Sequence, residues 1–101
     1  MALDIHKQDN NEYLFGLDSS KYEHLFEIFE SYQNWTGTYI DQYGDTKLTI
    51  ENQKTLIKII DKYVENTNIN LDKKKTITIL EFRGLLTYFI NSNINIELLG
   101  D

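Results

Sequence analysis

The chain has 101 residues, a hydrophobic fraction of 41% and a formal net charge of −6, which predicts one small folded domain spanning residues 1–101. It contains no cysteine, and this excludes disulfides, thiolate nucleophiles and sulfur-ligated metal sites. The N-terminus lacks the apolar segment of a secretory signal and no apolar run is long enough to cross a bilayer, so we expect a cytoplasmic protein.

The negative charge is concentrated in the N-terminal half of the chain. Residues 1–46 hold nine acidic side chains against two lysines, a balance of −7, whereas residues 47–101 hold seven acidic against eight basic side chains, a balance of +1. A surface of negative sign repels nucleic acid and membrane headgroups and attracts basic proteins. We therefore expect a protein partner and no nucleic-acid or membrane partner; the alternative is that the acidic residues serve only solubility.

The first twenty residues have the pattern of a β-hairpin. Two short apolar segments, residues 2–6 and 12–15, flank a polar connection, as in a pair of antiparallel strands. A helix is predicted to follow, because Ser20 with Glu23 three residues later forms a capping-box pattern.

This first helix is predicted to be amphipathic. Its apolar side chains recur at the spacing of one helical face, namely Tyr22, Leu25, Phe26, Phe29 and Tyr32. A second face carries an acidic stripe formed by Glu23, Glu27 and Glu30.

The helical periodicity ends near residue 33, and residues 33–47 are predicted to form a long loop with a short strand at 39–40. Irregular segments of this length are more often functional than simple connectors. Aromatic side chains here alternate with carboxylates, a combination that supplies contact area and attracts basic groups. We infer a partner-binding surface built from this loop and the acidic stripe: Glu23, Glu27, Glu30, Trp35, Tyr39, Asp41, Tyr43 and Asp45. The alternative is that the aromatic residues close the core beneath the loop.

Two more helices and a last strand are predicted after the loop. The second helix begins at Thr49, an N-cap residue type, runs to about Glu65 and buries Leu56, Ile57, Ile60, Tyr63 and Val64. The third runs from residues 73–75 to about 91 and is predicted to be the most buried, although residues 76–79 also alternate as a strand would. Residues 94–99 alternate and suit a strand beside the hairpin. The predicted fold class is α+β, with about three α-helices packed on a small antiparallel sheet formed by the N-terminal hairpin and the C-terminal strand.

The sequence shows no pattern typical of catalysis. His6 and His24 do not have metal-ligand spacing, and no glycine-rich phosphate loop or serine nucleophile elbow is present. Glu23 and Glu27 lie one turn apart, but on a polar face that does not supply the burial an acid–base pair needs. Asp41 and Asp45 lack the alternate ligands of a calcium loop. We therefore expect no enzymatic activity, no cofactor, no metal and no small-molecule substrate.

Four segments, Tyr13–Asp18, Thr36–Thr46, Asn52–Leu56 and Leu98–Asp101, resemble small bacterial immunity proteins of contact-dependent growth-inhibition and other polymorphic toxin systems. The resemblance implies a cytoplasmic inhibitor that binds the C-terminal domain of its cognate toxin in a one-to-one complex and covers the active site of a basic nuclease, an RNase or a DNase. It supplies no active-site motif, because contacting residues differ from pair to pair. The alternative function is an acidic secretion chaperone or adaptor, a class that commonly works as a dimer with an exposed apolar face.

Overall fold

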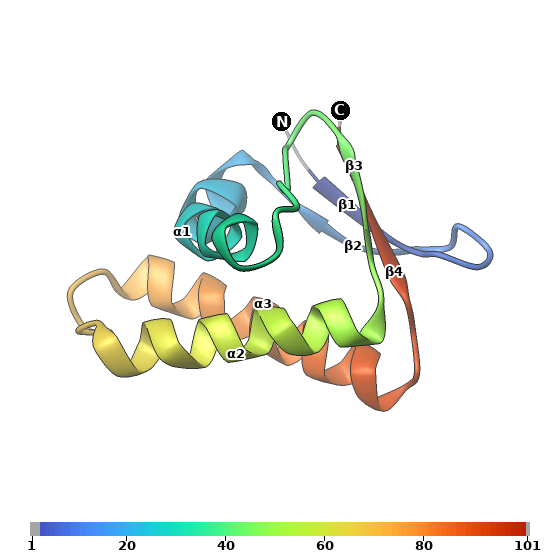
Figure 1. Ribbon diagram of the computed structural model, residues 1–101. Helices are drawn as coiled ribbons and strands as arrows, with labels where there is room; N and C mark the ends of the chain where they lie inside the picture. The colour runs from blue at the N-terminus through green and yellow to red at the C-terminus, as the bar shows by residue number, and fades with distance from the viewer. Residues whose placement is uncertain (1–2, 101) are drawn as a thin grey trace.

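The computed structural model describes residues 3–100 as three helices packed on a four-stranded antiparallel sheet (Figure 1). This confirms the predicted α+β class with its N-terminal hairpin and C-terminal strand. Position 2, in the first predicted strand, and position 101, in the Leu98–Asp101 segment of the family resemblance, lie outside the described residues. The elements in chain order are β1 (Leu3–Lys7), β2 (Tyr13–Leu17), α1 (Ser19–Thr36), β3 (Asp45–Leu48), α2 (Ile50–Asn66), α3 (Lys73–Asn91) and β4 (Ile96–Gly100).

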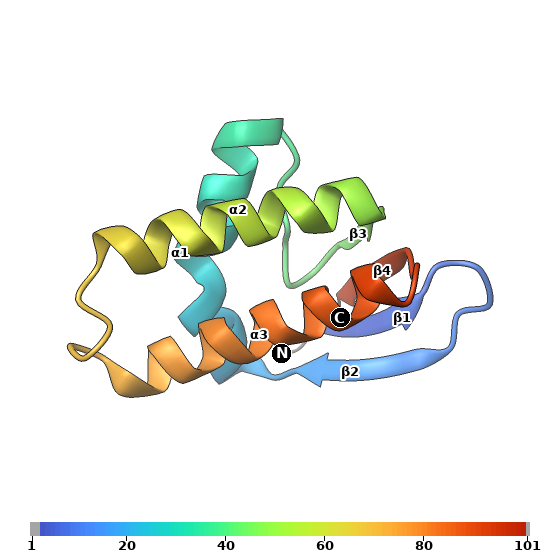
Figure 2. The same cartoon turned by 90° about the horizontal axis from the view of Figure 1, so that it is seen from below.

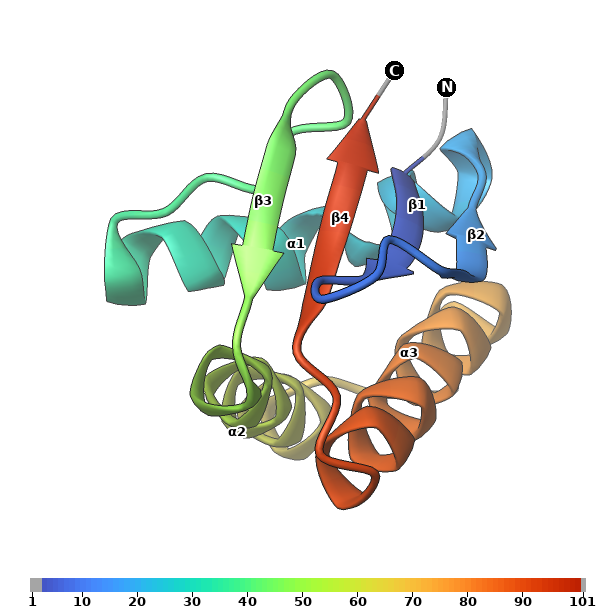
Figure 3. The same ribbon diagram turned by 90° about the vertical axis from the view of Figure 1, so that its right-hand side faces the viewer.

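The sheet has the order β2-β1-β4-β3, so the C-terminal strand pairs with β1 as expected and also with a strand that was not predicted. The predicted strand at residues 39–40 is wrong, because β3 begins only at Asp45. Strand β3 forms because Thr46 and Leu48 point into the core while it pairs with β4 along its length. Figure 3 shows α1 running behind the sheet, across the strands, with α2 and α3 at the lower end of the sheet.

Helix α1 begins two residues earlier than a Ser20 cap would place it. Asp18 is the N-cap, and its Oδ1 accepts a hydrogen bond from the backbone N–H of Lys21 at 2.9 Å. Ser20 lies inside the helix, so the predicted capping box is wrong. The buried face is also rotated, because Ile28 is buried while Phe26, which was predicted to be buried, is exposed.

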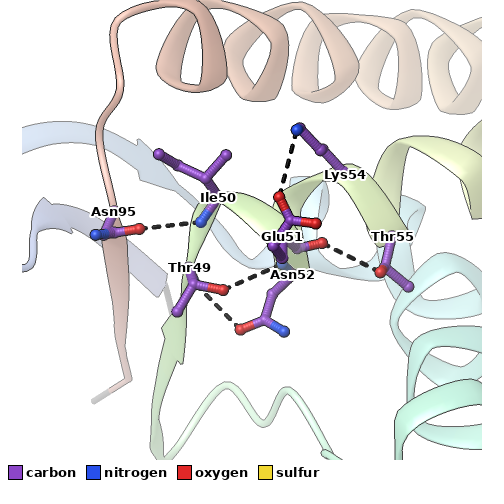
Figure 4. Close-up of polar contacts among 7 residues, drawn as sticks. All are labelled: Thr49, Ile50, Glu51, Asn52, Lys54, Thr55 and Asn95. Atoms are coloured by element: carbon purple, nitrogen blue, oxygen red, sulfur yellow. Dashed lines mark hydrogen bonds and ion pairs between the residues drawn. The ribbon is translucent and has the colours of Figure 1, made fainter.

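Helix α2 has the N-terminus that the sequence predicted. The Thr49 hydroxyl accepts from the N–H of Asn52 at 3.2 Å, and the Asn52 side chain accepts from the N–H of Thr49 at 3.1 Å (Figure 4). Asn95, just before β4, accepts from the N–H of Ile50 at 3.0 Å. The start of α2 is therefore fixed both by its own cap and by the segment that leads into the last strand.

Helix α3 is helical from its first turn, so the strand-like alternation at residues 76–79 does not form a strand. The prediction that it is the most buried helix is wrong. Only one face, made of Ile79, Phe82, Leu86 and Phe89, is buried, whereas Ile77 and Leu80 are exposed. Apolar composition predicted the burial, but α1 and α2 cover α3 from one side only.

Candidate protein-interaction surface

The acidic stripe on α1 is only partly free. Glu23 and Glu30 are exposed, and neither forms a hydrogen bond or ion pair with another residue of the described part of the chain. Glu27 lies on the side of α1 that faces α3, where its Oε1 accepts from the Nζ of Lys75 at 2.5 Å. The carboxylate of Glu27 raises the pKa of the Lys75 ammonium. The free negative charge of the helix is therefore that of Glu23 and Glu30.

The three aromatic residues predicted for this surface are exposed. Trp35 lies in the last turn of α1 and not in the loop, and the Nζ of Lys62 on α2 is 5.3 Å from its ring centroid. The exposed fractions are 50% for Trp35, 47% for Tyr39 and 61% for Tyr43. Ile40, which is fully buried, closes the core beneath the loop in their place. The alternative reading of these aromatics as core residues therefore does not hold.

A buried tyrosine fixes the loop against α1. The hydroxyl of Tyr22 donates to the carbonyl of Ile40 at 3.0 Å, and Figure 1 shows the segment between α1 and β3 rising beside the helix. Burial, the neighbouring Tyr39 hydroxyl and the charge of Asp41 raise the pKa of Tyr22 from 10.0 to about 12. The exposed Tyr39 is thus held beside a neutral, hydrogen-bonded phenol.

This raised pKa predicts a loss of stability at high pH. The folded-state pKa lies above the unfolded value, so the contribution of Tyr22 is complete below pH 10 and disappears between pH 10 and 12. We expect the free energy of unfolding to fall by about 2–3 kcal/mol over that range, as measured by urea denaturation. Burial also raises the pKa of Tyr32, so Tyr22→Phe should flatten the pH dependence without abolishing it. An unchanged slope in this variant would contradict the assignment.

The two aspartates of the predicted surface shape the turn that displays Tyr43. The Oδ1 of Asp41 accepts from the N–H of Tyr43 at 3.1 Å, and the carbonyl of Asp41 accepts from the N–H of Gly44 at 3.2 Å. The N–H of Gly100 on β4 donates to the carbonyl of Gly44 at 3.0 Å and lies 3.2 Å from the Oδ1 of Asp45. Asp41 and Asp45 therefore act first as turn-forming residues.

Gly100 permits the close contact between β4 and this turn. A Cβ atom at Gly100 would lie 2.6 Å from three backbone atoms, the carbonyl oxygen of Gln42 and the nitrogen and oxygen of Gly44. We expect Gly100→Ala to displace the turn and lower the free energy of unfolding by about 1–3 kcal/mol, with shifted amide NMR signals at residues 42–44. The matched control is Gly44→Ala, whose Cβ would meet only the Cβ of Asp41 at 3.8 Å. Equal effects of the two substitutions would contradict this role for Gly100.

A cavity that the sequence did not indicate opens beside Glu27. It has a volume of about 470 Å³ and lies where residues 67–72 connect α2 to α3. Val64 and Ile79 contribute apolar walls, and the Glu27–Lys75 ion pair lies beside the ring of Tyr63, whose centroid is 5.5 Å from the Nζ of Lys75. The cavity therefore combines apolar walls with one ion pair.

The cavity continues toward Trp35. A shallower hollow of about 220 Å³ shares Tyr63 and Thr67 with it and is bounded by Trp35 and Lys62. The exposed Leu71 also lines the larger cavity. The only sequence signal for this groove was the presence of Ile69 and Leu71 in an otherwise polar connection.

Residues 3–100 contain neither a cluster of metal ligands nor a membrane-spanning helix. No three histidine or acidic side chains there gather as metal ligands, and no helix among these residues has the length and apolar content to span a bilayer. No protein-family model, curated protein or solved structure matches the chain.

Proposed function

We propose that the protein is an immunity protein that binds the toxin domain of a contact-dependent growth-inhibition or related polymorphic toxin system and neutralises it. The observation that carries this proposal is the exposure of carboxylates and large aromatic side chains along α1 and in the loop that follows it. The carboxylates are those of Glu23 and Glu30, which have no partner among residues 3–100, and the aromatic side chains are Trp35, Tyr39 and Tyr43. Large aromatic residues dominate the binding energy of protein interfaces, and unpaired charges speed the encounter with an oppositely charged partner.

The partner that fits this surface best is a basic nuclease. A nuclease cleft is positively charged because its substrate is a polyanion, so carboxylates on α1 are suited to occupy phosphate positions. A one-to-one complex that covers the cleft would inhibit the nuclease by blocking its substrate, and it requires no catalytic residue in the inhibitor. The aromatic residues then supply apolar contact area next to the charged contacts.

The rigidity of the surface supports tight binding. Glu23 and Glu30 lie on a regular helix, and Tyr43 lies in a turn that is hydrogen-bonded to β4. Tyr39 is next to Ile40, whose carbonyl accepts the hydrogen bond from Tyr22. Because the backbone that carries these side chains is held in place before binding, less backbone entropy is lost on association.

The experiment is co-expression with the C-terminal domain encoded by the neighbouring gene. We expect this domain to arrest growth when expressed alone, and we expect the protein to restore growth and to co-purify with the domain in equal amounts. The matched control is the same domain with an unrelated acidic protein of similar size, which should not restore growth. Arrest that persists together with separate elution of the two proteins would rule the proposal out.

A secretion chaperone or adaptor is the second candidate, because α3 exposes Ile77, Leu80 and Tyr88 and this class commonly uses an exposed apolar face. The two functions differ in the state of the bound partner. An immunity protein binds the folded toxin domain, whereas a chaperone holds a segment that is not yet folded. Amide hydrogen exchange of the partner in the complex therefore separates them, since a folded toxin domain stays protected.

A further inference from the structure

The outer face of α3 carries three exposed apolar side chains around a glycine, and beside them the exposed Glu81, whose carboxylate pairs with Lys21 of α1 at 3.3 Å. Ile77, Leu80, Gly84 and Tyr88 recur at helical spacing, and all four are exposed. Figure 2 shows α3 on the lower surface of the molecule, with no other element lying over it in that view. We call these four residues the α3 stripe.

No contact among residues 3–100 requires a glycine at position 84. A Cβ atom at Gly84 would meet no atom within 4 Å, so alanine would fit without any rearrangement. Glycine is the least favourable residue in a helix interior apart from proline. A glycine at such a position is explained when the backbone of a second helix passes close to it, as happens where two helices cross.

The lysines of α3 are concentrated at its N-terminus, where the helix dipole disfavours positive charge. Its first turn contains Lys73, Lys74 and Lys75 and no acidic residue, and its last turn contains no basic residue. Positive charge at a helix N-terminus opposes the helix dipole. Lys75 is paired with Glu27, but Lys73 and Lys74 are exposed and have no ion-pair partner among residues 3–100. An antiparallel neighbour would bring the negative end of its own dipole close to them.

We propose that a second copy of this chain occupies the α3 stripe, so that two α3 helices cross in antiparallel orientation at Gly84. Leu80 and Tyr88 are complementary to each other about this residue, because they lie four positions before and after it, and Ile77 would face Asn91 of the other copy. Leu80 of each copy then packs against Tyr88 of the other, and Lys73 and Lys74 approach the carboxyl end of the opposite helix. Such a two-fold contact closes on itself and forms a dimer.

The stripe lies on α3, whereas the proposed toxin-binding residues lie on α1 and the loop after it, although Ile77 shares a shallow hollow with Ser20 and His24 of α1. A single pair of helices covers less than the roughly 800 Å² per partner of a standard interface. We therefore expect a weak dimer with a dissociation constant in the micromolar range. This inference does not depend on the proposed function, since it concerns the protein alone.

The test is sedimentation equilibrium of the whole chain over a wide concentration range. We expect the average mass to rise from the 11.9 kDa of the monomer toward twice that value as the concentration increases. Leu80→Lys should keep the mass at the monomer value. The matched control is Phe26→Lys on α1, where the replaced side chain is 42% exposed compared with 44% for Leu80, and it should associate as the wild type does.

Gly84→Ala gives a second, independent readout. In dilute, monomeric protein it should raise the thermal unfolding midpoint, because alanine favours the helix. At high concentration it should weaken the dimer at least tenfold, because two methyl groups would separate the crossing helices. A wild-type protein that remains monomeric at all concentrations would overturn the proposal. Equal loss of association in Leu80→Lys and Phe26→Lys, or a Gly84→Ala dimer as tight as the wild type, would do so as well.

Discussion

Substitution of Gln53 by glutamate is expected to lower the free energy of unfolding by about 3–5 kcal/mol at neutral pH. Gln53 is fully buried in α2, and its Nε2 donates to the carbonyls of Leu48 at 3.1 Å and Ile94 at 2.9 Å. These carbonyls lie at the end of β3 and shortly before β4. Glutamate has the same shape but no N–H, so both carbonyls would lose their donor and face a carboxylate. Urea denaturation followed by circular dichroism measures the loss.

The destabilisation in Gln53→Glu should depend on pH with a definite sign. Burial and the two carbonyl oxygens would raise the pKa of the new carboxyl group above its unfolded value. The loss of unfolding free energy relative to the wild type is therefore complete at pH values above the folded-state pKa, and it becomes smaller as the pH falls through that value. The stability gap to the wild type should be narrower at pH 5 than at pH 8.

Gln53→Met is the matched control, because methionine has a similar shape and carries no charge. It removes both hydrogen bonds and should cost about 1–3 kcal/mol, with the same gap to the wild type at pH 5 and pH 8. Equal losses in the two variants at both pH values would show that the buried carboxylate adds nothing to the loss of the two hydrogen bonds, and would contradict the predicted pH dependence.

The elements that could be predicted from the sequence are those specified locally. Helix α2 has its cap within one segment, and this cap appears in the structure. Of the residues predicted to be buried in α2, Leu56 and Ile60 are buried and Ile57, Tyr63 and Val64 are half-buried, whereas the burial of Gln53 and Ile59 was missed. Strand β3 was missed because residues 45–48 form a strand only through pairing with β4, about fifty positions later in the chain. Similarly, Asp18 and Ser20 are both capping residue types. Asp18 is the cap because β2 ends at Leu17, whose side chain is buried in the core, and the helix begins directly after it.

The candidate surface was predictable in composition but not in detail. The sequence contained the carboxylates and aromatics, but it could not show that Glu27 pairs with Lys75, a residue 48 positions away, while Glu23 stays free. The exposure of Tyr39 likewise depends on its neighbour Ile40, which is buried in the core and bonded through its carbonyl to Tyr22. In both cases a contact from a distant segment decides which of two similar residues faces the solvent.

Reversing the two free charges on α1, with Glu23→Lys and Glu30→Lys together, is expected to weaken binding of the toxin domain by about 10²–10³-fold. These residues are better targets than Asp41 and Asp45, because the two aspartates accept hydrogen bonds that shape the turn at residues 41–45. Neither Glu23 nor Glu30 has such a role in the described structure, so the fold should be preserved. Most of the change at low salt should appear in the association rate, which surface plasmon resonance measures.

The matched control for this pair is Asp9→Lys with Glu12→Lys, which changes the net charge of −6 by the same amount at two exposed positions in the connection between β1 and β2. If the total charge alone attracts the partner, both double variants should bind equally weakly. If the α1 surface forms the contact, the control should lose much less affinity. The difference should shrink as ionic strength rises, because salt screens exposed charges over about 8–10 Å. A toxin domain that binds the α1 variant as tightly as the wild type would place the contact elsewhere on the molecule.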